Sequence, residues 1–312
     1  MLPEIVSLLA ATLRISPPIA LASIGGAYSE RSGVINIGLE GMILMGALAG
    51  VAATYFVGNP WVGVLAAILA GGALGLLHAV LCIRFKANQV VSGVGVNILS
   101  LGLTTLLLQV IWGNRGASDP VTGLRPLSLP LIKDIPIIGD IFGNQNPLVY
   151  IMLVIVVFAW LVMFRTPLGL KIRAVGEHPE AADTVGINVH KIQYLCVTLS
   201  GMLSGLGGAY LSLGWLNLFS QNMSAGRGYI ALAANIFGKW NPAGAFGASL
   251  LFSFTDALQI KLQGVQILPG VEIPIQFIQM IPYILTILVL ASAVKRAVPP
   301  AAIGKHYEKG EK

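Results

Sequence analysis

Charge is scarce in this sequence, and that scarcity excludes an ordinary soluble domain. Only 10% of its residues are Asp, Glu, Lys or Arg and 55% are hydrophobic, whereas soluble domains carry roughly 25% charged residues. The mean hydropathy is +0.81. A length of 312 residues is enough for about eight to ten membrane spans of roughly 20 residues each. We therefore expect one all-α polytopic membrane protein.

Cysteine and histidine are also rare, and neither forms a pattern that carries chemistry. The two cysteines, Cys82 and Cys196, fall at the expected cytosolic ends of spans, and the four histidines are scattered. We expect no disulfide and no metal site from them. The phosphate-binding motif GxxxxGKS/T is absent, as are HExxH and GxSxG. The sequence thus predicts a non-catalytic chain with no bound cofactor.

The excess of basic residues is best explained by membrane topology. The formal net charge is +6, but Lys and Arg flank apolar spans and form no stripe with interleaved aromatic residues. We therefore expect no nucleic-acid partner. The long polar run at 165–193 contains Arg165, Lys171, Arg173 and Lys191, which place it on the cytoplasmic face under the positive-inside rule.

Apolar runs of bilayer length recur along the chain. The clear ones lie at 34–57, 61–83, 89–112, 147–164 and 192–214. Before them, Arg14 and the pair Pro17 and Pro18 interrupt an apolar start, so the first crossing is broken or preceded by an interfacial helix. No basic segment with an A-x-A cleavage site opens the sequence, and we expect insertion through its own first spans.

The loops and the end of the chain complete the expected topology. Residues 113–146 are rich in Gly, Pro and Asp with balanced charges, which predicts an outward-facing loop. A last span is expected at 275–294, where Lys295 and Arg296 stop it on the cytosolic side. The sequence thus predicts a membrane domain of residues 1–296 and a solvated cytoplasmic tail of residues 297–312.

One apolar region, residues 229–262, is interrupted in a way that suggests function. The interruption leaves a first piece too short to cross alone, and it consists of Gly238, Lys239, Trp240, Asn241 and Pro242. This pattern predicts a broken or re-entrant helix. Irregular backbone at membrane depth is tolerated only against protein or a water-filled cavity, so the break is expected to line the path or form a gate. A simple loop between two short spans is the alternative.

A few polar residues fall inside apolar segments, where unpaired charge is costly. In SERSGVINIGLEG, residues 29–41, we expect Glu30 and Arg31 to form an interfacial charge pair at a helix end. Asn36 and Glu40 lie one helical turn apart, which is compatible with a shared face toward a cavity or with a purely structural role. The other intramembrane polar residues of interest are Asn97, Asn235 and Asp256.

Small residues recur at the spacing that lets helices pack closely in lipid. The pairs are Gly46 with Gly50, Gly71 with Gly75, and Gly201 with Gly205. The tetrapeptide GGAY also occurs twice, at 25–28 and 207–210. This repetition is compatible with the internal repeat of a transporter and also with chance in a chain rich in Gly and Ala.

With these residues in view, the sequence from about residue 9 to 296 resembles the permease subunits of ABC importers for ribose, branched-chain amino acids and nucleosides. The polar run at 165–193 resembles the family's cytoplasmic loop, and its EAAxxxG core matches Glu180, Ala181, Ala182 and Gly186. The resemblance implies a type II-like importer fold in which these residues dock on a separate cytoplasmic ATPase. The interrupted segment is similar to the family's broken helix, where Gly238, Lys239, Asn241 and Pro242 would form the gate.

Within that family, SERSGVINIGLEG resembles the nucleoside branch, and the chain is similar to its shorter permease. The resemblance implies a second permease subunit, a substrate-binding lipoprotein outside the cell and a location in the bacterial inner membrane. It also implies that the route residues are Asn36, Glu40, Asn97 and Asn235. An importer of ribose or another simple sugar is the first alternative, and a secondary transporter or a membrane scaffold protein the next.

Overall fold

The five clear spans expected between residues 34 and 214 appear as helices in the computed structural model, which describes residues 2–128, 130, 135–263, 266–268, 271–272, 280, 284, 287 and 298–308. Within these described residues, five helices are long and apolar enough to cross a membrane. They are α3 (Leu39–Val57), α4 (Pro60–Ala79) with the π-helix η1 (Val80–Arg84), α5 (Gln89–Trp112), α8 (Pro147–Arg165), and α11 (Val189–Ala209) with the π-helix η2 (Tyr210–Leu216). The expected span at 275–294 lies almost wholly outside the described residues.

The start of the chain forms the expected broken crossing. Helices α1 (Leu2–Ile15) and α2 (Pro17–Arg31) are bent by 51° relative to each other at a short break, and together they are apolar enough for one span. Pro17 begins the second helix at a position where proline is tolerated. The described part of the chain thus holds five spans, or six with this bent pair. The total of eight to ten therefore stays a prediction.

The span expected at 34–57 begins later than the hydropathy indicates. Residues 34–36 adopt no regular structure, and α3 starts only at Leu39. Gly33 has φ +93°, in the left-handed region that favours glycine, so the chain leaves α2 sharply. An apolar but non-helical stretch therefore runs through the interior and needs partners for its backbone polar groups.

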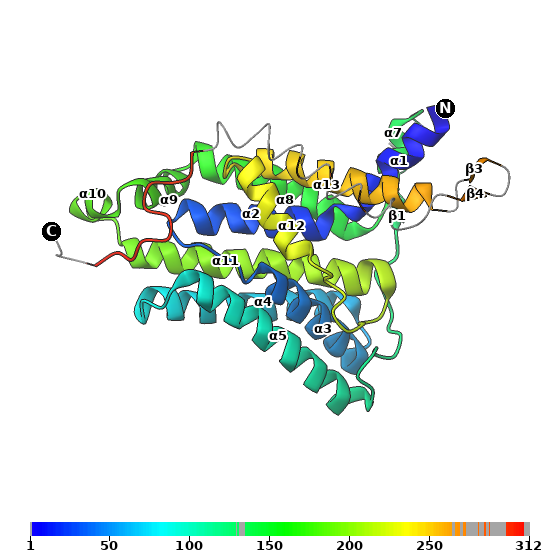
Figure 1. Ribbon diagram of the computed structural model, residues 1–312, viewed down its shortest axis with the longest axis horizontal. Helices are drawn as coiled ribbons and strands as arrows, with labels where there is room; N and C mark the ends of the chain where they lie inside the picture. Colours follow the sequence, from blue (N-terminus) through cyan, green and yellow to red (C-terminus); the bar gives the residue numbers. More distant parts are fainter. Residues whose placement is uncertain are drawn as a thin grey trace.

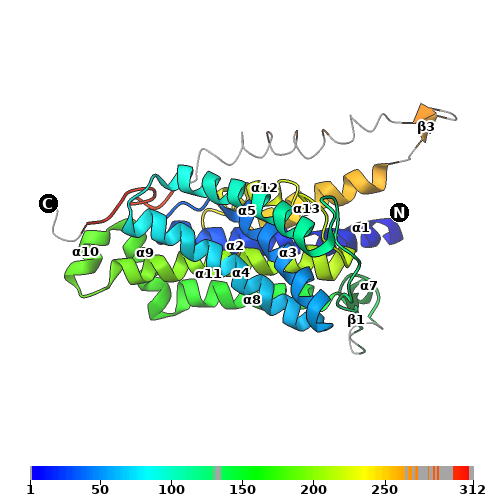
Figure 2. The same ribbon diagram turned by 90° about the horizontal axis from the view of Figure 1, so that it is seen from below.

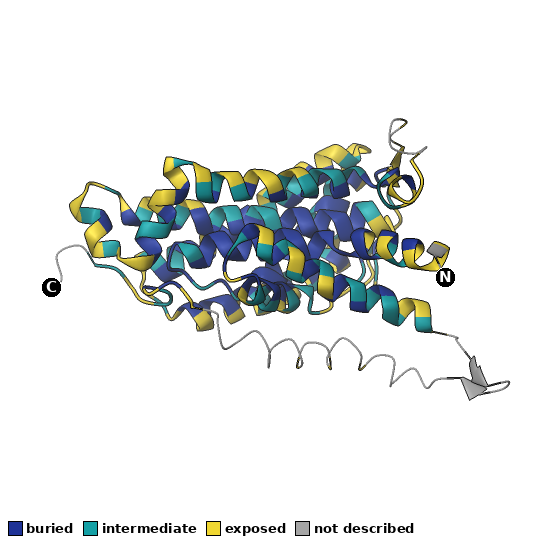
Figure 3. Cartoon of the chain, turned by 90° about the horizontal axis from the view of Figure 1, so that it is seen from above, coloured by how far each residue is buried: buried dark blue, intermediate teal, exposed yellow. Residues whose placement is uncertain are grey.

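Helices α2 and α11 lie side by side in the middle of the bundle (Figure 2). Buried residues, dark blue in Figure 3, concentrate in its interior. Every residue of α2 from Pro17 to Glu30 is buried. Close glycine contacts join α11 to its neighbours: a methyl group on Gly71 of α4 would overlap the carbonyl oxygen of Gly201, and one on Gly46 of α3 would overlap the backbone of Gly205. The predicted small-residue packing is confirmed at these positions.

The polar segments lie at opposite ends of the bundle (Figure 1). One end carries α9 (Pro167–Glu177), α10 (Pro179–Thr184) and the tail at 298–308. The other carries α7 (Ile138–Phe142) and the antiparallel strands β1 (Leu127–Ser128) and β2 (Asn144–Gln145), with Leu127 opposite Gln145. The remaining elements are α12 (Arg227–Phe237), α13 (Pro242–Leu262) and the antiparallel pair β3 (Gln266–Leu268) and β4 (Val271–Glu272).

The tail differs from its expected solvated state. Ala302 is 8% exposed, and its amide donates a hydrogen bond to the carbonyl oxygen of Gly176 at 2.9 Å. The amide of Gly304 donates to the carbonyl oxygen of Gly33 at 3.0 Å. These bonds attach the tail to the ends of α9 and α2, so at least this part of it is packed against protein.

Candidate functional site: the broken helix and the coupling segment

The interrupted segment at 229–262 is a broken helix, as predicted. Helix α12 ends at Phe237 and α13 begins at Pro242, with Asn241 capping the new helix by accepting a hydrogen bond from the amide of Ala243 at 3.0 Å. Between them Lys239 and Trp240 both have positive φ, at 55° and 53°. Two successive non-glycine residues in the left-handed region are uncommon and need strong tertiary support.

That support comes from the end of α2. Glu30 is 5% exposed, and its Oε2 accepts hydrogen bonds from Asn235 Nδ2 at 2.9 Å and from the indole N–H of Trp240. Arg31 donates from Nε to the carbonyl oxygen of Trp240 at 2.9 Å and from Nη2 to that of Lys239 at 3.1 Å. The expected charge pair between Glu30 and Arg31 is therefore wrong, because both side chains bind the break instead of each other.

Arg31 also reaches the coupling segment, here defined as residues 165–193. Its Nη1 lies 3.8 Å from Oε1 of Glu177, the last residue of α9. The other carboxylate oxygen of Glu177 accepts a hydrogen bond from the amide of Ala301 in the tail at 3.2 Å. A methyl group on Gly176 would overlap the carbonyl oxygen of Arg31, so α9 and α2 touch through their backbones. One guanidinium therefore joins the broken helix to the coupling segment.

The EAAxxxG core of the coupling segment folds as a short helix and a turn. Helix α10 starts with Pro179, carries Glu180 and Ala181 on its exposed side and buries Ala182 at 3% exposure. Gly186 follows with φ +83°. The amides of Gly186 and Ile187 close the turn by donating to the carbonyl oxygens of Asp183 and Ala182 at 2.9 and 3.0 Å. This left-handed helix end is the geometry that glycine allows at little cost.

The non-helical stretch before α3 is held by Asn36 and Asn97. Asn36 is fully buried, donates to Ser200 Oγ at 2.9 Å and accepts from the amide of Gly38 at 3.1 Å. Asn97 accepts from the amide of Gly41 at 2.8 Å and donates to the carbonyl oxygen of Ile37 at 3.0 Å. These amides replace the hydrogen bonds that a helix would have made. Side chains of three further residues bind the same stretch: Ser29, His78 and Gln89.

Glu40 binds the start of α12. Its Oε1 accepts hydrogen bonds from Ser224 Oγ at 2.6 Å and the amide of Gly226 at 2.8 Å, and its Oε2 accepts from the amide of Gly228 at 2.6 Å. A carboxylate in this position is favoured by the free amides and the positive dipole of a helix N-terminus. The expectation that Asn36 and Glu40 share one helix face is wrong, because Asn36 precedes the helix.

A cavity of about 460 Å³ opens beside the same elements, on α12 and α13. Its polar lining includes Arg227, Tyr229, Asp256 and Gln259, and Phe252 contributes an aromatic face. The hydroxyl of Tyr229 accepts a hydrogen bond from Asn97 Nδ2 at 3.1 Å, which links the cavity wall to α5. Within the described residues, Oδ1 of Asn235 is buried without a hydrogen-bond partner.

Sequence reasoning did not assign roles to several residues that this arrangement uses. Trp240 lay inside the predicted break, and its indole was a visible donor in an apolar region. Arg227 precedes the apolar run of α12 and was a visible intramembrane charge. Ser200 and Ser224 gave no usable signal, since serine is common in membrane helices and only the fold brings these two to Asn36 and Glu40.

Comparison with known proteins finds one family and several close relatives. Residues 8–290 match the family described as branched-chain amino acid transport system / permease component. The guanosine ABC transporter permease protein NupQ of Bacillus subtilis is 42% identical, covering 97% of this chain and 96% of that protein. The nucleoside ABC transporter permease protein NupC of Lactococcus lactis is 41% identical, covering 95% of each chain.

Two further relatives bear on substrate and assembly. A protein assigned as a glucose ABC transporter permease of Haloferax volcanii is 38% identical, covering 95% of this chain and 96% of that protein. The guanosine ABC transporter permease protein NupP of Bacillus subtilis is 25% identical, covering 96% of this chain and 84% of that protein. One organism thus has two guanosine permeases that are both similar to this chain.

Proposed function

Since this chain belongs to the family of branched-chain amino acid transport system permease components, we propose that it is the permease subunit of an ABC importer that takes up nucleosides. It is a multi-pass protein of the bacterial inner membrane with several apolar helices. The observation that carries the substrate is the high identity, over nearly the whole length, to permeases named for guanosine and for nucleosides.

The coupling segment is the proposed docking site of a separate cytoplasmic ATPase. Glu180 and Ala181 are exposed on α10, and Ala182 fixes the inner side of that helix in the bundle. Small side chains allow close approach of a partner surface, and the left-handed turn at Gly186 ends the helix sharply. The P-loop that this chain lacks would be supplied by that partner.

The broken helix is the proposed gate, moved through Arg31. A shift of α10 and α9 on ATP binding would displace Glu177, and the guanidinium of Arg31 connects this carboxylate to the carbonyl groups of Lys239 and Trp240. Gly238, Asn241 and Pro242 form the rest of the break. Contacts that join packed elements in this way transmit displacement because those elements hold discrete arrangements.

The route is proposed to lie between this chain and a second, homologous permease subunit. Charged groups cannot face hydrocarbon at low cost, so the cavity with Arg227 and Asp256 fits an interface or a water-filled path better than lipid. Tyr229 lines the cavity and Asn97 binds its hydroxyl, and we propose that both would contact the substrate. The other three predicted route residues, Asn36, Glu40 and Asn235, are buried and would act by holding the gate elements in place.

Reconstitution tests this proposal. Proteoliposomes containing this chain, a second permease, the ATPase and a substrate-binding lipoprotein should take up radiolabelled guanosine or adenosine on addition of ATP. Ribose should compete poorly. Because the receptor supplies most of the specificity in this scheme, substitutions of Asn97 or Tyr229 should lower the flux more than they change the selectivity.

Sugar uptake is the second candidate, favoured by the similarity to the protein assigned to glucose transport. ATP-driven ribose or glucose uptake without nucleoside uptake would move the assignment to sugars. Uptake by this chain alone, driven by a proton or sodium gradient, would overturn the importer class. Failure of the chain to co-purify with any ATPase would contradict the proposed docking.

A further inference from the structure

The tail at 298–308 binds the coupling segment and the neighbouring helix ends at several points along its length. Beyond the backbone bonds of Ala302 and Gly304 already described, the ring of Tyr307 lies 5.5 Å from that of His190 at the start of α11. Glu308 forms an ion pair with Lys86, which follows η1. The tail therefore connects the ends of α2, α4 and α9 at one end of the bundle.

Tyr307 also contacts the core of the coupling segment. Desolvation, a hydrogen bond to Asp183 and the negative charges of Asp183 and Glu180 all raise the pKa of the Tyr307 hydroxyl. A tyrosine hydroxyl is protonated at neutral pH, so Tyr307 is the donor in this bond and Asp183 on α10 is the acceptor. The tail thus binds the helix that carries the EAAxxxG core.

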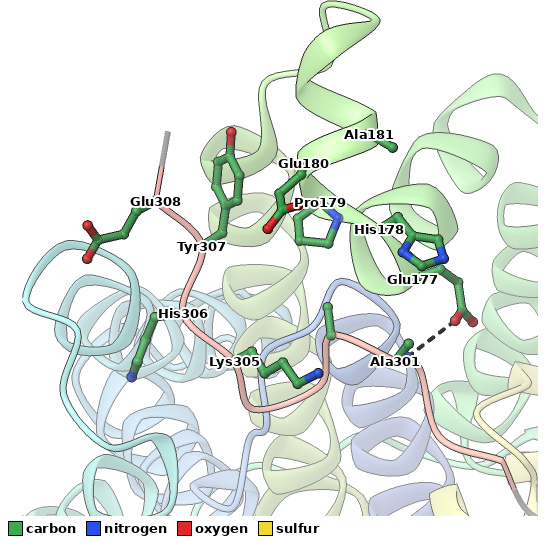
Figure 4. Close-up of a pocket in the computed structure, with 11 residues that line it drawn as sticks. Glu177, His178, Pro179, Glu180, Ala181, Ala301, Lys305, His306, Tyr307 and Glu308 are labelled. Carbon is green, nitrogen blue, oxygen red and sulfur yellow. Dashed lines mark hydrogen bonds between the residues drawn. The ribbon is translucent and has the colours of Figure 1, made fainter. Parts of the chain in front are cut away.

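A groove of about 350 Å³ opens between the two segments. Figure 4 shows residues of α10 along one side and residues of the tail along the other. One wall is Glu177 to Ala181, and the other consists of Ala301, Ala302, and Lys305 to Glu308. Each wall combines apolar and charged residues, with the carboxylate of Glu180 on one side and the ammonium of Lys305 on the other. Both residues are exposed.

We propose that the ATPase docks on a composite surface, in which this groove and the tail at 301–308 take part together with α10. This inference rests on the proposed function and extends the docking site beyond the loop at 165–193. The groove is continuous with Ala181 of the expected docking helix, and it presents both charge signs at its rim. It therefore fits a loop of the ATPase that carries a basic side chain opposite Glu180 and an acidic one opposite Lys305.

The same geometry gives the tail a mechanical role in docking. Glu177 holds the tail through the amide of Ala301 and faces Arg31 through its other oxygen. A partner bound in the groove would contact both walls. It would thereby displace Glu177, the residue through which the coupling segment contacts Arg31 and the broken helix.

Photo-crosslinking in membranes that contain the complete importer tests the composite surface. Benzoylphenylalanine would replace Lys305 in the groove, Ala181 on α10, and Val298 as the control. Val298 is 80% exposed and belongs to the same tail but does not line the groove. We expect crosslinks to the ATPase from positions 305 and 181, at least about tenfold above the yield at 298.

The crosslinking results distinguish a failure of the composite surface from a failure of the proposed ATPase docking site. Crosslinks from 181 with only the control yield at 305 would overturn the composite surface and leave the docking of α10 intact. Equal yields at 305 and 298 would do the same, since the tail would then be merely nearby. Absence of crosslinks from both 181 and 305, in an importer that still transports nucleosides, would overturn the docking site itself.

A pair of substitutions provides a second measurement. Lys305→Glu should weaken the affinity of the ATPase for the permease about tenfold, a change that corresponds to about 1.4 kcal/mol. Val298→Glu places the same charge on the tail outside the groove and should leave the affinity unchanged. Equal affinities of both variants would contradict the proposed charge contact.

Discussion

Arg31 and Trp240 are 209 positions apart, and the guanidinium Nε of the first donates a hydrogen bond to the carbonyl oxygen of the second at 2.9 Å. The bond holds a residue with φ 53° in the middle of a broken helix. The same guanidinium faces Glu177 at the end of α9. The break and the coupling segment are therefore connected through one side chain.

The first prediction concerns this connection. Arg31→Lys should lower the number of nucleosides transported per ATP hydrolysed at least about tenfold, because an ammonium cannot span the two carbonyl groups and Glu177 at once. Binding of the ATPase should persist. The ratio of uptake to phosphate release in proteoliposomes measures the effect. Arg115→Lys is the matched control, since Arg115 is exposed, lies outside the coupling segment and donates from Nε to Oε1 of Gln109 at 3.1 Å.

One result would contradict the prediction for Arg31. If Arg31→Lys leaves the transport ratio at the wild-type value, the side chain only stabilises the fold. A loss of similar size in Glu177→Gln, without a further loss in the double variant, would show that both residues act in one connection.

A second prediction concerns Glu40. Replacing Glu40 with Gln leaves one side-chain oxygen for three hydrogen-bond donors and turns an N–H group toward the amides of α12. Glu40→Gln should therefore lower the free energy of unfolding by about 1.5–3 kcal/mol. The midpoint of thermal unfolding in detergent should fall clearly. Glu4→Gln, at an exposed position of α1, is the control and should leave the midpoint unchanged. An unaltered midpoint in Glu40→Gln would mean that its hydrogen bonds contribute little to stability.

A third prediction uses the turn at Gly186. A Cβ at this position would meet open space, so any penalty comes from φ +83° alone. Gly186→Val should therefore abolish coupled transport, while Gly186→Asn should retain most of it, since Asn tolerates the left-handed region. Gly247 of α13 also faces open space but is helical, so Gly247→Ala should be silent. Equal transport by the Val and Asn variants would exclude backbone strain as the cause.

A fourth prediction tests the glycine contacts between α4 and α11. Gly71→Ala should destabilise the chain by about 1–3 kcal/mol, because the methyl group would overlap the backbone at Gly201 and force the helices apart. Gly102→Ala, on the open side of α5, adds the same group where nothing lies within 4 Å. The difference between the two unfolding midpoints measures the effect. Similar midpoints would show that the helices adjust freely.

The fifth prediction concerns topology. Single cysteines at Ala181 and Asp119, in a chain without Cys82 and Cys196, should react with an impermeant reagent from opposite sides of the membrane. Both positions are exposed. Ala181 belongs to α10, and Asp119 lies in the loop that leads to β1, at the opposite end of the bundle from α10 (Figure 1). The neighbouring Ser118 is unsuitable because it is 7% exposed. Reaction of both cysteines from the same side would refute a cytosolic coupling segment with an outward loop at 113–146.

Much of the helix layout could be predicted because hydropathy and local signals agree. The span expected at 89–112 coincides with α5, and the break at 238–242 separates α12 from α13. Asn before Pro marks helix starts at Asn59, Asn146 and Asn241, where the amide side chain caps the first turn and proline loses no hydrogen bond. These signals are local, so one sequence suffices to find them.

Composition and the length of the apolar runs were enough to predict a polytopic membrane protein with a broken helix and one long polar segment, because burial in lipid follows from them. Only the tertiary structure decided what the buried polar residues do. Glu30, Arg31 and Glu40 bind residues about 150 to 210 positions away. Hydropathy indicates only that such a group needs a hydrogen-bond or charge partner inside the membrane. The identity of that partner depends on how α2 and α3 pack against the helices around them.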